Sequence, residues 1–258
     1  MSVAEMTDPT IEMLRDPGPV HHLLGNTTWE RSVSWGMPWQ FDTAAHWVAE
    51  AQAFRERHAG EPHTHRLTTR LDHEVALCIL GGWGMPYETG LAAFASLQRA
   101  GLLHPDADVD AIRDVLQRPL SVAGGTRRYR FPVQRASRLR AALHYLHSAP
   151  AQPDPDHRSF RDWLAQCPGI GLKTASWVTR NWLDSDAVAI LDIHVLRAGQ
   201  AAGVFDPTWT APRHYRIIEQ AFIDWAHIGG VRVADLDAVI WRAQARQART
   251  THRSRSHQ

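Results

Sequence analysis

The sequence predicts a mostly helical protein that folds into two lobes with a cleft between them. Apolar residues recur at spacings of three and four in most segments, alternating runs are few, and nothing repeats at a fixed period. The chain of 258 residues exceeds the usual size of one domain but is too short for two large independent domains. With 44% apolar and 21% charged residues, it has enough apolar side chains to form buried cores.

Ten segments carry the helical spacing, and glycine or proline separates several of them. Gly81 and Gly82 end the second predicted helix, and Gly124 and Gly125 break the chain again, because glycine leaves helical geometry readily. The stretch Ser148–His157 is rich in proline and predicts a linker. In chain order the predicted helices are Thr43–Glu56, His73–Leu80, Thr89–Ala100, Val109–Leu116, Ala136–Leu146, Ser159–Gln166, Lys173–Trp182, His194–Ala202, Arg213–Trp225 and Leu236–Ala245.

The composition excludes several kinds of protein. Cys78 and Cys167 are the only cysteines, too few for a four-thiolate cluster, a cysteine-only zinc site or a disulfide framework. No stretch approaches the roughly 18 uncharged apolar residues of a membrane span, and the acidic opening lacks the features of a signal peptide. We therefore expect a cytoplasmic, nucleoid-associated protein that contacts no membrane and needs no metal or organic cofactor.

Positive charge is unevenly placed, although the formal net charge is only +1. Six arginines fall between Arg127 and Arg140, and the tail after residue 246 is basic and polar. Lys173 is the only lysine among the 28 basic residues. Arginine stays protonated and cannot readily serve as an amine nucleophile. The single lysine therefore indicates a chemical role for Lys173.

A glycine-rich turn leads directly into the helix that carries Lys173. In CPGIGLKTASWVTRNW, Gly169 and Gly171 permit a tight turn and close approach of the backbone. The helix that follows begins with free amide groups, an arrangement suited to holding a phosphate. The segment therefore predicts a site that binds phosphates of a DNA backbone. A helical hairpin whose glycines only form the bend would have the same pattern.

Asp192 follows Lys173 by nineteen residues, where the apolar run AVAIL ends and a new helix begins. At the N-cap its carboxylate would accept backbone N–H bonds and stay ionised. A fixed negative charge is therefore predicted next to the hairpin.

The hairpin GIGLKTAS, followed at this spacing by AILDIHVLR, resembles the helix-hairpin-helix DNA glycosylases, and its lysine resembles the 8-oxoguanine glycosylase/lyase branch. The resemblance implies an all-α, two-lobed helix-hairpin-helix glycosylase fold with the active-site cleft between the lobes. It also implies a nucleophilic Lys173, an essential Asp192 and His194 near a DNA phosphate. The expected activity is excision of an oxidised purine, 8-oxoguanine, with associated AP-lyase activity through a Schiff base.

Excision requires the damaged base to leave the duplex and enter a pocket. There it stacks on aromatic side chains while polar groups form hydrogen bonds with its edge. Trp177 lies on the same helix face as Lys173. The segment ADLDAVIWRAQAR resembles the base-binding segment of archaeal-type 8-oxoguanine glycosylases, which implies roles for Asp237 and Trp241. We expect Trp177 and Trp241 to sandwich the purine and Asp237 to accept the N7–H that distinguishes 8-oxoguanine from guanine. Trp83 and Gln40 are further candidates for the same pocket.

The arginine-rich stretch 127–143 resembles the segment that precedes the hairpin in archaeal relatives, and we expect Arg130 and Arg135 to contact the DNA backbone. The expected partner is double-stranded DNA with a damaged base, bound by a monomer. The predicted parts are an N-terminal extension (1–25), a helical domain (26–126), the hairpin domain (127–201), C-terminal helices that complete the first domain (202–246) and a basic tail (247–258).

Two other functions fit the same residues. A glycosylase for another modified or alkylated base would share the hairpin, the lysine and the aspartate and differ in its pocket. A non-catalytic helix-hairpin-helix protein would use the hairpin only to hold phosphates. The pattern also leaves open the base opposite the lesion and the balance of lyase to glycosylase activity.

Overall fold

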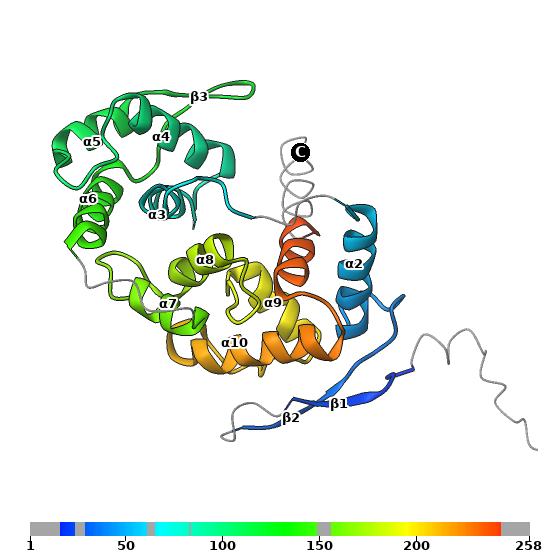
Figure 1. The fold of residues 1–258 in the computed structure, drawn as a ribbon. Helices are drawn as coiled ribbons and strands as arrows, with labels where there is room; N and C mark the ends of the chain where they lie inside the picture. The colour runs from blue at the N-terminus through cyan, green and yellow to red at the C-terminus, as the bar shows by residue number, and fades with distance from the viewer. Residues whose placement is uncertain (1–15, 24–28, 61–64, 83, 149–155, 244–258) are drawn as a thin grey trace, which may run out of the picture. The chain divides into compact units, whose positions relative to one another are not determined.

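The computed structural model of the chain describes residues 16–23, 29–60, 65–82, 84–148 and 156–243. These residues are mostly helical, as the sequence predicts (Figure 1). The helices are α2 (Ala44–Arg57), α3 (Leu71–Leu80), α4 (Tyr87–Arg99), α5 (Val109–Gln117), α6 (Pro132–Ser148), α7 (His157–Leu164), α8 (Leu172–Leu183), α9 (Ile193–Ala201), α10 (Ala211–Ile228) and a last one over 233–243.

Two short antiparallel hairpins were not predicted. One pairs β1 (Val20–Leu23) with β2 (Arg31–Ser34), and the other pairs β3 (Leu120–Val122) with β4 (Gly125–Arg127). Strands of three or four residues are too short to show a clear alternation of apolar and polar side chains. The predicted break coincides with the turn of the second hairpin: Gly124 lies in the turn and Gly125 begins β4.

The chain divides into two compact units, one formed by residues 62–188 and the other by residues 1–61 together with 189–258. The boundaries expected from the sequence lie elsewhere, at 126/127 and 201/202. The difference arises because α6 packs on both α3 and α5, so the helices before residue 127 and the hairpin after it share one core.

Helix α3 is the centre of the unit formed by residues 62–188. Residues 74–80 are all buried, and α3 packs on α4, α6 and α8. A helix that is apolar on every side is stable only when other elements surround it. The helices α4, α6 and α8 surround α3, so α3 and its C-terminal turn are held against α8.

One carboxylate is completely buried in this unit. Glu74 of α3 accepts hydrogen bonds from the backbone N–H groups of Leu67 and Thr68 and from Nδ2 of Asn181 on α8, at 2.8 to 3.2 Å. The Thr68 hydroxyl donates a further bond at 2.9 Å. A buried charge is tolerated when hydrogen bonds satisfy it in this way. Glu74 therefore joins the segment before α3 to the helix that carries Lys173.

The other unit is built around α10. The indole N–H of Trp225 donates to the carbonyl of Ala44 at 3.2 Å, and the Tyr215 hydroxyl donates to the carbonyl of Ala189 at 2.8 Å. Glu219, also buried, accepts from the backbone N–H of Ala189 at 3.1 Å. These bonds fix the stretch that leads to Asp192. Among the described helices, none is long and apolar enough to span a membrane.

Replacing Glu74 by alanine is expected to lower the free energy of unfolding by about 3 kcal/mol, because four donors lose a buried acceptor. Urea denaturation followed by circular dichroism measures the loss. The matched control is Glu50→Ala on exposed helix surface, expected within about 0.5 kcal/mol of the parent. Equal losses in the two variants would show that the Glu74 network contributes nothing to stability.

Candidate active site

The hairpin consists of α7, a turn over residues 165–171, and α8, which packs against α7. Asp156 begins α7 by accepting from the backbone N–H groups of Arg158 and Ser159. Within the turn, the buried Cys167 thiol lies 3.8 Å from the carbonyl of Ala142 on α6, and burial raises the pKa of that thiol to about 12. The turn is therefore fixed to α6 by a neutral thiol.

Position 169 requires glycine for two reasons: the conformation of its backbone and the closeness of the Arg138 side chain. Its φ of +83° lies in the left-handed region, and a Cβ there would stand 2.7 Å from Cγ of Arg138. The aliphatic stem of Arg138 thus lies directly on the glycine backbone. Gly171 differs, because its φ is −95° and an added Cβ would meet no atom within 4 Å.

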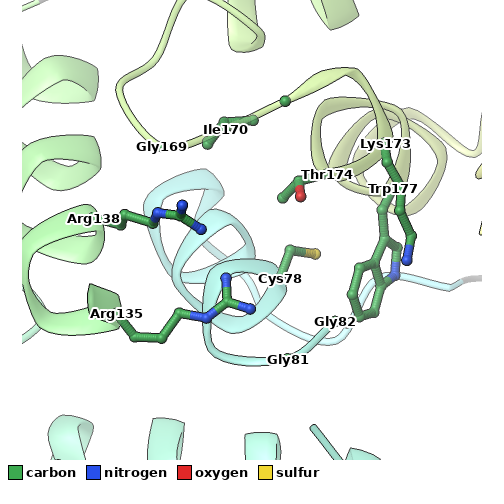
Figure 2. A pocket seen from close by; sticks show the side chains of 11 residues that line it. Cys78, Gly81, Gly82, Arg135, Arg138, Gly169, Ile170, Lys173, Thr174 and Trp177 are labelled. Carbon is green, nitrogen blue, oxygen red and sulfur yellow. The ribbon is translucent and has the colours of Figure 1, made fainter. Parts of the chain in front are cut away.

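Helix α8 begins at Leu172, and its N-cap residue, Gly171, has no side chain that could cap it. The amides of its first turn have no partner within the helix, so they are available to an anion. Lys173 lies in that first turn, half-buried, and Trp177 lies one turn later. Figure 2 shows the two side chains next to each other on α8.

A cavity of about 440 Å³ opens beside this end of α8. Four segments of one unit contribute to it: the end of α3 with the turn after it, α6, the hairpin turn and the start of α8 (Figure 2). The residues that line it are Cys78, Gly81, Gly82, Arg135, Arg138, Gly169, Ile170, Gly171, Lys173, Thr174 and Trp177.

The turn after α3 forms one wall of the cavity. A Cβ on Gly81 would stand 3.3 Å from Cη2 of Trp177, so the edge of the indole ring lies close against the glycine backbone. Gly82 follows with a left-handed φ of +84°. Burial raises the pKa of the Cys78 thiol well above its ordinary value. The thiol is therefore neutral, and the charges that line the cavity are those of Arg135, Arg138 and Lys173.

Asp192 caps α9, which confirms the predicted capping role. One carboxylate oxygen, Oδ1, accepts from the backbone N–H groups of His194 and Val195 at 2.8 and 2.9 Å. No hydrogen bond of the described residues engages Oδ2. The imidazole of His194 is half-buried, and its Nδ1 is a buried atom without a hydrogen-bond partner in the described part of the chain.

The remaining predicted residues occupy different environments. Asp237 is buried on the helix 233–243, and Trp241, on the same helix, is 42% exposed. Both ends of the Gln40 amide are engaged, with Met37 N–H and the Asp16 carbonyl, so its side chain stabilises a turn. The exposed guanidinium of Arg130 lies 5.1 Å from the ring centre of Phe131. Trp83 lies outside the described residues.

Sequence reasoning missed six residues of the cavity: Cys78, Gly81, Gly82, Arg138, Ile170 and Thr174. For Arg138 a signal existed, because it lies in the arginine-rich stretch 127–143, three positions after Arg135, which was expected to contact DNA. No group of three or more His, Cys, Asp or Glu side chains in the described ranges is arranged to hold a metal ion.

Residues 56–230 match the family model of the 8-oxoguanine DNA glycosylases with a helix-hairpin-helix, Ogg-HhH. The chain belongs to this family. It is therefore a DNA glycosylase, as the sequence predicts. The match begins near the end of α2, so the hairpin β1–β2 and most of α2 precede the part that the family defines.

Solved glycosylase structures share the fold. The 8-oxoguanine DNA glycosylase of Thermotoga maritima aligns with a TM-score of 0.55 at 23% identity, over 77% of this chain and 95% of that one. That of Methanocaldococcus jannaschii gives 0.53 at 22% identity, over 78% and 86%. The M. jannaschii 8-oxoguanine glycosylase/lyase in complex with a 15mer DNA containing 8-oxoguanine gives 0.52 at 21%, over 78% and 89%. At these identities the likeness concerns the fold.

The two hairpin glycines are expected to respond differently to alanine. Gly169→Ala should lower the free energy of unfolding by at least about 2 kcal/mol, because its φ is left-handed and its Cβ would collide with the Arg138 stem. Gly171→Ala, with open space and an ordinary φ, should change it by less than about 1 kcal/mol. Chemical denaturation of both variants checks this difference, and equal effects would contradict the described turn.

Proposed function

We propose that this glycosylase excises 8-oxoguanine from duplex DNA and cleaves the strand through a Schiff base on Lys173. The observation that carries the proposal is the place of the chain's only lysine: at the start of the hairpin helix α8, facing a cavity and beside Trp177. The family match supports the substrate class.

The chemistry requires an amine and a carboxylate. The neutral amine of Lys173 would attack C1′ of the deoxyribose, the base would leave, and the resulting imine would permit β-elimination. Asp192 has one oxygen occupied by the cap of α9, and its other oxygen would stabilise the positive charge that develops on the sugar. The cap holds the carboxylate in a fixed orientation.

Other residues would bind the flipped base and the phosphates of the DNA. Trp177 and Trp241 would supply the faces on which the flipped base stacks, and Asp237 would accept the N7–H of 8-oxoguanine. The glycine turn, Gly169 to Gly171, would hold a backbone phosphate by its amides. His194, Arg130 and Arg135 would contact further phosphates of the double-stranded DNA, which the protein would bind as a monomer.

Borohydride trapping tests the role of Lys173. With a duplex containing 8-oxoguanine, the parent protein should give a covalent protein–DNA adduct, and Lys173→Gln should give none. Lys173→Arg is the matched control for charge, and it should also give none, because a guanidinium stays protonated. The same assay with a duplex containing an alkylated purine tests the alternative substrate. Adducts in the Lys173 variants, or none from the parent at 8-oxoguanine and abasic sites, would contradict the proposal.

Asp192→Asn should slow base release at least about a hundredfold while the protein stays folded, because asparagine caps a helix as well as aspartate but carries no charge. Asp156 caps α7 with the same pair of backbone bonds, so Asp156→Asn is the matched control and should leave the rate unchanged. Single-turnover release of the base measures both. Similar rates of base release in the two variants would show that the charge of Asp192 takes no part in the reaction.

Asp237→Asn should weaken the preference for 8-oxoguanine over guanine by about tenfold or more, because an amide can turn its N–H₂ toward the guanine N7 acceptor. Competition between duplexes that contain one base or the other measures this ratio. A variant that loses affinity for both duplexes equally would assign Asp237 a structural role.

A further inference from the structure

Two arginines of α6 extend side by side into the cavity that contains Lys173. Arg135 and Arg138 are three residues apart, and Figure 2 shows both side chains reaching from α6 into the space below the hairpin turn. None of the described residues that line this cavity is acidic. The cavity therefore combines three cationic side chains with no carboxylate.

Neither guanidinium is neutralised within the described part of the chain. No ion pair or hydrogen bond with another described residue engages either one, and Nε of Arg135 is a buried atom without a partner. The pKa of Arg135 lies below its ordinary value, mainly because of burial and also because Arg138 is close. Two neighbouring, half-buried cations without a counter-charge repel each other, and an anion between them would offset that repulsion.

The hairpin places further donors at the same point. The stem of Arg138 lies on the backbone of Gly169, so its guanidinium is held beside the turn that leads into α8. The first turn of α8, whose amides have no partner within the helix, also lines the cavity. A phosphate there would meet two guanidinium forks and a helix N-terminus, and it would lie in the same cavity as the Lys173 amine.

We propose that Arg135 and Arg138 bind the phosphate that leaves during strand cleavage, as a 5′-phosphate monoester at the end of the downstream strand. This inference rests on the proposed Schiff-base function of Lys173. It assigns the two arginines to the elimination step and to retention of the cleaved product.

The elimination balances as follows. The iminium formed on Lys173 acidifies C2′, and the C2′ proton passes to water while its electron pair forms the enamine. The enamine nitrogen then restores the iminium, a C2′–C3′ double bond forms, and the C3′–O3′ bond breaks. The oxygen departs with the phosphate, whose charge changes from −1 as a diester to about −2 as a monoester. No oxidant or reductant takes part.

This change in charge explains why the arginines would act mainly on elimination. Base release leaves the charge of the phosphate unchanged, so the arginines bind it equally before and after that step. During elimination the phosphate gains negative charge, and charge-assisted bonds to guanidinium groups become stronger. Groups that bind a transition state more tightly than its ground state accelerate the step.

Single-turnover kinetics on a duplex containing 8-oxoguanine separate the two steps, with base release and strand cleavage measured in parallel. The double variant Arg135→Gln/Arg138→Gln keeps the Cβ, Cγ and Cδ atoms of each stem, including those that pack on Gly169. Its ratio of cleavage rate to base-release rate should fall at least about tenfold. Lysine at both positions should restore part of the ratio, because the charge returns without the fork.

The control is Arg140→Gln, on the same helix but not in the cavity lining, which should leave both rates unchanged. Thermal unfolding of each variant shows whether the helices remain packed. An unchanged ratio in the double variant, whether both rates fall together or neither does, would overturn the inference.

Product binding tests the site without chemistry. The parent protein should bind a duplex with a one-nucleotide gap about tenfold more tightly when the downstream strand carries a 5′-phosphate than when it carries a 5′-hydroxyl, and the double variant should lose this preference. No preference in the parent, or a preference for a 3′-phosphate on the upstream strand, would overturn the inference. Absence of the Lys173 adduct would instead reject the proposed function, so the two failures are distinguishable.

Discussion

The contact between the Arg138 stem and the backbone of Gly169 sets the positions of the groups around the cavity. Only glycine permits that approach, because a Cβ would stand 2.7 Å from Cγ of Arg138 and the backbone is left-handed. The contact fixes the turn against α6, and the turn in turn fixes the start of α8 with Lys173. The buried Cys167 thiol, against the carbonyl of Ala142, is a second contact between the turn and α6. The cationic cavity thus depends on one glycine.

Local patterns in the sequence predicted the helices and the cap of α9 but missed the two short β-hairpins. The helical spacing located α8 within one residue at each end, and an aspartate at the end of an apolar run predicted the cap of α9. Contacts between distant segments were not predictable. The position of Gly81 against Trp177, and of Arg138 on Gly169, depends on how helices pack, and no pattern within one segment encodes it. Gln40 was placed in a pocket by its chemistry, whereas its amide bonds within a turn.

Residues 29–55 contact the rest of their unit although they precede the family match. Arg31 of β2 donates to the carbonyl of Gly203 at 2.8 Å and pairs with Asp206 at 3.2 Å, both in the connection between α9 and α10. Ala44 of α2 accepts from the buried Trp225 of α10. The segment thus supports the helices that follow Asp192, and it has to be kept whenever that unit is studied.

Lys173 is the only side-chain amine of the protein, and this gives the cavity an intrinsic spectroscopic probe. Reductive methylation with ¹³C-formaldehyde would label that amine and the chain's α-amino group and no other position. The Lys173 methyl resonance would arise beside the indole of Trp177, whose ring current shifts it away from that of a free dimethyl-lysine. A single magnetic resonance signal would then report on the state of the cavity without any substitution.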